Sequence, residues 1–391
     1  MSSHPVWGRG FRPFFLAAGG YGGGLTLAWI AIWSGAWPAP AWLAPSLWHA
    51  HEMLFGLVAA AIAGFLLTAV PVWTGRRALA GRPLLALTAL WAAGRLAMLS
   101  AGALPAGLVA AVDLAFLPAL AVVLARHLWR TGQRRNYGIP GVVLALTLAN
   151  AAVHAQALGW ASSSASRTLR FAAHAVVILI VVIGGRITPA FTANALRSRG
   201  VSAAVRSRPW LDRAAIASVV GVAAADLLAP GSTASASLSC LAGLLVAARM
   251  AGWQTARAWR DPLAASLHAG MAWVAIGLVV IGAGGLGWTL SGTAGLHALT
   301  AGAMGSMILA VMTRVALGHT GRPLALPAGA AGCYLLVHAG AAARVGAGLA
   351  PDAHQVSLLV AAGLLWAAAF WLFTVLYWPI LTRPRVDGKE G

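Results

Sequence analysis

Long apolar segments recur along the whole chain and are separated by short segments rich in Gly, Pro and Arg. A helix of about 20 mostly apolar residues can cross the ~30 Å hydrocarbon core of a bilayer. Helix-breaking sequences such as Pro38-Ala39-Pro40 separate neighbouring segments. The pattern predicts twelve membrane-spanning helices, at residues 14–34, 48–71, 83–101, 106–126, 138–160, 170–190, 211–229, 235–256, 263–286, 295–317, 327–347 and 355–381.

The composition favours the same class of protein. The chain has 391 residues, of which 60% are hydrophobic and 9% are charged, whereas soluble domains carry about 25% charged residues. The strands of a membrane β-barrel are shorter than these segments and alternate in polarity. We therefore predict an all-α integral membrane protein that forms a single polytopic domain over residues 1–391.

The basic residues lie mainly in short loops. The formal net charge is +19, but the chain has no basic, aromatic-interleaved domain of the kind that binds nucleic acid. Arginines gather in loops after even-numbered spans, such as Arg76, Arg77 and Arg82, and are absent after spans 1, 3, 7 and 9. Because basic loops stay on the cytoplasmic side, we predict cytoplasmic N- and C-termini and no nucleic-acid partner.

Spans 2, 6 and 10 end in similar sequences, each with an aromatic residue or His followed by Thr. His51 precedes Thr74 by 23 residues, and His297 precedes Thr320 by the same 23 residues. The third copy is looser, with 18 residues between its His and its Thr. Chance similarity among Ala-, Leu- and Gly-rich helices is one explanation. The simplest interpretation is three tandem four-helix pseudo-repeats, as found in transporters, at roughly 1–133, 134–260 and 261–385.

Histidines gather near the predicted outer ends of the spans. They are His49, His51, His154, His174 and His297. A single His in a membrane helix is more often a hydrogen-bonded core residue than a ligand, but several at one depth favour a metal site, because imidazole binds iron, copper and zinc. Glu52 and Asp113 are acids at the same depth. Each is expected to orient a ligand His or to carry protons.

A second, cationic group is expected toward the cytoplasmic side. It consists of Arg186, His268, His319 and Arg322, with Arg95 and Arg344 farther along. A buried Arg at membrane depth needs an anionic partner. Haem propionates would serve, and the alternative is that these arginines cap carbonyl groups or bind lipid phosphate. The Gly-rich run at residues 19–24 permits either close helix approach or space for a flat macrocycle.

Several motifs together resemble the NnrS family. They are FRPFFL at 11–16, WHAHEMLFG at 48–56, AGFLLTAVPVWTGR at 63–76, GGRITPAFTANAL at 184–196 and HALTAGAMGSMILAVMTRVALGHTGRPL at 297–324. They occur in order across nearly the whole chain. The family consists of bacterial twelve-span inner-membrane proteins linked to nitric oxide metabolism and nitrosative stress. The resemblance therefore implies a multi-pass protein of the bacterial inner membrane that holds haem b and copper.

The first functional hypothesis is a haem and copper protein that binds or converts nitric oxide in the nitrosative-stress response and denitrification. In this hypothesis His51 and His297 bind haem, with its propionates near Arg186, His319 and Arg322. Copper is bound by His49 together with His154 or His174. Glu52 or Asp113 delivers protons as a catalytic group, and the electron donor is unknown.

Two further functions stay open at this point. A metal or haem transporter, or a metal-insertion protein, would use the same histidines transiently. A non-catalytic sensor or assembly partner of respiratory enzymes would use them without turnover. The sequence therefore leaves open whether the protein is an enzyme, such as a haem–copper oxidoreductase acting on nitric oxide.

Overall fold

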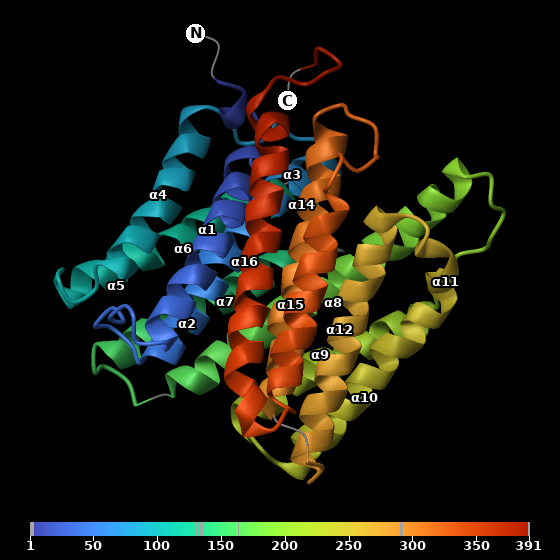
Figure 1. The fold of residues 1–391 in the computed structure, drawn as a ribbon. Helices are drawn as coiled ribbons and strands as arrows, with labels where there is room; N and C mark the ends of the chain where they lie inside the picture. Colours follow the sequence, from blue (N-terminus) through green and yellow to red (C-terminus); the bar gives the residue numbers. More distant parts are fainter. Residues whose placement is uncertain (1–3, 130–131, 133–135, 163, 290–291, 390–391) are drawn as a thin grey trace. The chain divides into compact units, whose positions relative to one another are not determined.

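The computed structural model describes residues 4–129, 132, 136–162, 164–289 and 292–389 (Figure 1). In these ranges the regular secondary structure is helical, and β-structure is limited to two isolated bridges, Ala41–Leu43 and Ala101–Leu104. The chain forms two compact units. The first unit comprises Met1–Ala172, Met312–Ala325 and Phe370–Gly391, and the second comprises Ala173–Val311 and Leu326–Ala369.

The first unit contains the N-terminal helices. They are η1 (Pro5–Trp7), α1 (Phe11–Trp33), α2 (Pro45–His51), the π-helix η2 (Glu52–Val58), α3 (Ala59–Thr74), α4 (Arg82–Leu99), α5 (Ala106–Leu114), α6 (Phe116–Trp129) and α7 (Gly138–Ala157). Helices α2, η2 and α3 follow one another without a break over Pro45–Thr74. This long helix ends because Gly75 adopts a left-handed conformation, with φ of 65°, and its N–H bonds to the carbonyl of Pro71.

The second unit contains most of the later helices. They are α8 (Ala165–Ser198), α9 (Pro209–Leu228), α10 (Thr233–Met250), η4 (Ala251–Trp253), α11 (Thr255–Ala258), α12 (Pro262–Gly285), α13 (Gly292–His297), the π-helix η5 (Ala298–Met304), α14 (Gly305–His319), α15 (Ala331–Ala347) and α16 (Asp352–Thr382). The start of α8 and the ends of α14 and α16 belong to the first unit. Helix α12 packs against α10 and η5. A Cβ atom on Gly277 would lie 2.7 Å from the side chain of Leu299, so the glycine permits this close packing.

The predicted class of fold is confirmed. Among the described residues, nine helices are long and apolar enough to cross a membrane. The other three predicted spans, 83–101, 211–229 and 327–347, fall on α4, α9 and α15, which are shorter or carry more polar residues. The count of twelve spans stays a prediction. The division into two units tests neither the single polytopic domain nor the three pseudo-repeats, which also stay predictions.

The Gly-rich run in α1 serves helix packing. Gly19, Gly22 and Gly23 face the last part of α16, which lies beside α1 in Figure 1. A Cβ atom on Gly22 would lie 2.9 Å from Leu57 and 3.0 Å from Phe370. Of the two explanations given by the sequence, the structure therefore supports close approach of helices at Gly19, Gly22 and Gly23, whereas nothing lies within 4 Å of the Cβ positions of Gly20 and Gly24.

Candidate metal centre

A cluster of buried polar side chains lies inside the first unit. Its members are Tyr21 from α1, His51 from α2, Glu52 from η2, Arg95 from α4, Asp113 from α5, and Asn150 and His154 from α7. Apart from Tyr21, which is partly buried, each of these residues is at most 7% exposed. Ionisable groups inside a membrane protein are costly unless they pair with one another. The cluster is therefore the first place to look for function.

Local helix geometry brings His51 and Glu52 together. Helix α2 ends at His51, and the next seven residues form a π-helix, an element that occurs often at functional sites. The indole Nε1 of Trp91 donates to the carbonyl of Gly56 in this π-helix at 3.0 Å. A Cβ atom on Gly56 would lie 3.2 Å from Cδ of Arg95, so glycine at this position lets the Arg95 side chain pass to Glu52.

Glu52 accepts hydrogen bonds through both of its carboxylate oxygens. Oε1 accepts from Arg95 Nη1 at 2.7 Å and from His51 Nδ1 at 2.9 Å. Oε2 accepts from the hydroxyl of Tyr21. These partners come from three other helices, so Glu52 ties the start of the π-helix to α1, α2 and α4.

Asp113 is the second acid of the cluster. Its Oδ1 accepts from Arg95 Nη2. Its Oδ2 accepts from Asn150 Nδ2 at 2.8 Å and from His154 Nε2 at 2.8 Å. Because Arg95 donates to both Glu52 and Asp113, it bridges the two carboxylates and offsets part of their charge.

Both ring nitrogens of His51 have polar partners. Its Nδ1 faces the Glu52 carboxylate, and its Nε2 lies 2.8 Å from the carbonyl oxygen of Asn150. The Asn150 amide has this orientation because its Nδ2 donates to Asp113. These contacts fix the orientation of the imidazole ring inside the cluster.

Three side chains of the cluster can hold a metal ion. One donor atom each from His51, Asp113 and His154 lies within 4.8 Å of the others, and all three residues are buried. Within the part of the chain that the structure describes, no other set of His, Cys or acidic residues is this close. Two imidazoles and a carboxylate suit first-row transition metals. An ion would replace the proton on His51 Nε2, and Glu52 would orient the ring through Nδ1.

The side chains around His51 are closely packed. His51 is 0% exposed. A Cβ atom on Gly94 would lie 3.2 Å from Oδ1 of Asp113, and one on Gly56 would be as close to Arg95. The donor set of this cluster suits a single metal ion. Haem ligation by His51 stays a prediction.

Gly94 is predicted to be essential for this packing. Gly94→Ala would place a Cβ atom 3.3 Å from Cα of Asp113, so α4 and α5 would have to separate. We expect the free energy of unfolding in detergent to fall by about 1–3 kcal/mol. Unfolding is measured by tryptophan fluorescence. Gly107→Ala on α5 is the matched control, because nothing lies within 4 Å of its Cβ position. Equal stability of the two variants would contradict the close packing of α4 on α5.

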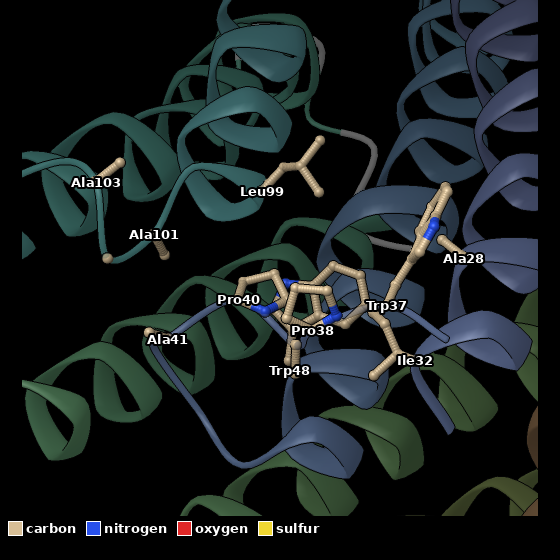
Figure 2. Close-up of a pocket in the computed structure, with 12 residues that line it drawn as sticks. Ala28, Ile32, Trp37, Pro38, Pro40, Ala41, Trp48, Leu99, Ala101 and Ala103 are labelled. Atoms are coloured by element: carbon tan, nitrogen blue, oxygen red, sulfur yellow. The ribbon is translucent and has the colours of Figure 1, made fainter. Parts of the chain in front are cut away.

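An apolar cavity lies in the same unit (Figure 2). Its volume is about 470 Å³, and Trp37, Pro38 and Trp48 are among the residues that line it. Trp48 also packs in the hydrophobic cluster that includes Trp42, whose ring lies 5.6 Å from that of His154. Hydrophobic side chains next to the cavity therefore contact the metal-site residues, and a small neutral molecule suits this environment.

His49 and His174 lie outside the donor set. The ring of His49 stacks on Trp29 with centroids 4.4 Å apart. His174 belongs to the second unit, where its Nδ1 lies 3.9 Å from Asp226. The structure thus groups His154 with His51 and Asp113. The roles of His49 and His174 as ligands stay predictions.

His297 has a local structure similar to that of His51 but different partners. Each His precedes a seven-residue π-helix that has glycine at its fifth position. An acid, Glu52, follows His51, whereas Ala298 follows His297. Nδ1 of His297 instead donates to the carbonyl of Thr293 at 2.7 Å. His297 therefore has no carboxylate at the position that orients His51.

The predicted cytoplasmic group is divided between the two units. His319 and Arg322 belong to the first unit, and Arg186 and His268 to the second. His319 packs against Phe11, with ring centroids 5.8 Å apart. Both ring nitrogens of His268 bond to threonine hydroxyls at 2.8 and 3.0 Å. Binding of haem propionates by Arg186, His319 and Arg322 stays a prediction.

Sequence reasoning missed three members of the cluster. Arg95 was grouped with the cytoplasmic arginines, whereas it pairs with Glu52 and Asp113. Tyr21 and Asn150 were not selected at all. Asn150 had a usable signal, because a polar residue inside an apolar span is usually buried against a partner. Tyr21 lies in a run of glycines that indicates close helix approach or space for a macrocycle and gives no sign of a polar contact.

Comparison with known proteins gives the family. No curated protein matches the chain. A family model described as NnrS protein matches residues 5–385. This confirms the resemblance carried by the motifs. Since the match covers nearly the whole chain, this membrane protein belongs to the NnrS family, and that membership supports a role in the nitric oxide response.

Proposed function

We propose that the first unit binds a redox-active metal ion at His51, Asp113 and His154, and that this centre binds nitric oxide. One observation carries the proposal: three buried donor atoms lie within 4.8 Å of one another in an NnrS-family protein. Copper is the metal implied by the family resemblance. Two imidazoles and a carboxylate also bind non-haem iron, so metal analysis decides between the two.

Each residue of the cluster has a distinct task in this proposal. His51, Asp113 and His154 hold the ion, which supplies an open coordination position for nitric oxide. Glu52 fixes the orientation of His51 and shares a hydrogen bond with Tyr21, through which a proton can be held. Arg95 keeps both carboxylates ionised by bonding to each of them. The apolar cavity beside Trp48 favours a neutral diatomic molecule over an ion.

The proposal covers binding of nitric oxide and assigns no ligand to haem b. Conversion of nitric oxide needs electrons, and their donor is unknown. Haem b stays an expectation from the resemblance, and the predicted haem ligands His51 and His297 stay predictions. The bacterial inner membrane and the cytoplasmic termini are part of the proposal and rest on the positive-inside rule.

Metal analysis of the purified protein tests this function. The wild type should contain roughly one copper or iron ion per chain, and His51→Ala and His154→Ala should lower metal affinity at least tenfold. His127→Ala is the control, because His127 lies at the end of α6, where its ring nitrogens bond to the carbonyls of Val123 and Arg77, and it is not part of the cluster. Nitric oxide should alter the electron paramagnetic resonance spectrum of the wild type alone.

The same measurement separates the alternatives. Equal metal content in the wild type and both His variants would contradict the proposed centre. Metal that is sub-stoichiometric and lost on dilution would support a transporter or a metal-insertion protein. Tightly bound metal with no response to nitric oxide would support an assembly partner.

A further inference from the structure

A second buried group of the first unit is cationic. Arg12, the second residue of α1, is 0% exposed. Its Nη1 donates to the carbonyls of Leu381 at 2.8 Å and Arg383 at 2.7 Å, at the end of α16. Its Nε and Nη2 are also buried and have no protein acceptor. A buried charged donor without a partner is costly, so these two nitrogens point to a missing ligand.

The two unsatisfied nitrogens lie on one edge of the guanidinium. Nε–H and Nη2–H point in parallel and together bond to two oxygens of a phosphate or carboxylate. The bonds from Nη1 to α16 hold the guanidinium plane in place, so this edge is fixed before a ligand arrives. Such a fork recognises a planar pair of oxygens better than a Lys ammonium does.

Neighbouring arginines add to the positive charge. Arg9, Arg322 and Arg385 are close enough to repel the Arg12 guanidinium. Nη1 of Arg322 is itself buried without a protein acceptor. Burial, together with the charge of Arg383, lowers the pKa of Arg322. An anion bound among these arginines would lower their mutual repulsion.

The acid next to this group is already engaged. Asp387 accepts from Nε of Arg385 at 2.8 Å and from Nη2 of Arg385 at 2.5 Å. These bonds hold the pKa of Asp387 below its usual range. Among the described residues, no carboxylate pairs with Arg12 or Arg322. The protein therefore supplies donors for an anion and does not supply the anion.

We propose that Arg12 and Arg322 form a binding site for a phosphate group. Both residues lie at the ends of membrane helices, Arg12 at the start of α1 and Arg322 after α14, where lipid phosphates are found at a bilayer surface. The phosphate comes either from a lipid headgroup or from free phosphate. The site shares no residue with the metal centre and does not depend on the proposed function.

Binding to the delipidated full-length protein in a phosphate-free detergent tests the site. The probes are inorganic phosphate, with chloride at equal ionic strength as its control, and phosphatidylglycerol in mixed micelles, with diacylglycerol as its control. We expect a phosphate-bearing probe to raise the thermal midpoint of the wild type, and Arg12→Lys and Arg322→Gln to weaken its apparent affinity at least tenfold. Arg77→Gln, a change at an exposed loop arginine of the same unit, should have no effect.

The variants keep the outcome clear. Arg12→Lys retains the positive charge but loses the bidentate Nε and Nη2 edge. Arg322→Gln leaves the hydrogen bonds of Arg12 to α16 intact. A response to phosphatidylglycerol alone identifies a lipid site, and a response to both probes identifies a site for phosphate in general. Unchanged affinity in both variants, or equal stabilisation by diacylglycerol, would overturn the proposal.

Discussion

Asp113→Asn is expected to release the metal and to lower the free energy of unfolding by about 3–5 kcal/mol, the usual cost of removing one partner from a buried ion network. The Asp113 carboxylate accepts hydrogen bonds from Arg95, Asn150 and His154. An amide in its place would turn N–H groups toward some of these donors and would leave an excess of positive charge. The loss should appear both in metal content and in unfolding titrations in detergent.

Asp226→Asn is the matched control for this change. Asp226 is an acid on α9 in the other unit, and its side chain is 15% exposed. We expect its replacement to change stability by no more than about 1 kcal/mol and to leave the metal content unchanged. If Asp113→Asn kept its metal and lost as little stability as the control, the cluster would not be the metal centre.

Arg95→Met is expected to have the second large effect, again a loss of about 3–5 kcal/mol in the free energy of unfolding, because it removes the cation that bridges the Glu52 and Asp113 carboxylates. Adding Glu52→Gln removes one of the two negative charges that Arg95 would have balanced. The Gln side chain can still accept from His51 and can donate to the hydroxyl of Tyr21. The loss of unfolding free energy in the double variant should therefore be smaller than the sum of the two single losses, by about 0.5–3 kcal/mol.

A double-mutant cycle measures this coupling. The four proteins are compared by the free energy of unfolding under one set of detergent conditions. Pairing Glu52→Gln with Arg77→Met, at an exposed loop arginine, supplies the control cycle and should give additive losses. Additive losses in the Arg95 cycle would mean that Glu52 and Arg95 do not share one charge-balanced network.

Ionisable residues in the apolar spans indicated part of the buried cluster, whose role as a metal centre is a proposal. His51, Glu52, Asp113 and His154 were recognisable because each places an ionisable group in an apolar span. The sequence did not show that His51 and His154, rather than His49, His174 or His297, would join the cluster. All five histidines lie at similar predicted depths. The distinction arises from Glu52 and from α4, α5 and α7, which bring Arg95, Asp113 and Asn150 to His51.

The two π-helices show how similar sequences acquire different chemistry. WHAHEM and HALTAGAM both place His directly before a π-helix. In the first, Glu52 anchors the imidazole, and in the second a backbone carbonyl does so. The 23-residue spacing between His and Thr predicted a pseudo-repeat and not the π-helix that follows each His. It did not reveal that only one copy sits among acids.

The sequence by itself determined the membrane class, the approximate position of the helices and the family, because hydrophobicity, helix length and motif order are local properties of the chain. Only the tertiary structure decided which polar groups meet. A membrane helix is apolar both toward lipid and toward its neighbours, so its periodicity does not mark the packing face. The pairing of Arg95 with two carboxylates, and the unsatisfied edge of Arg12, follow from that packing alone.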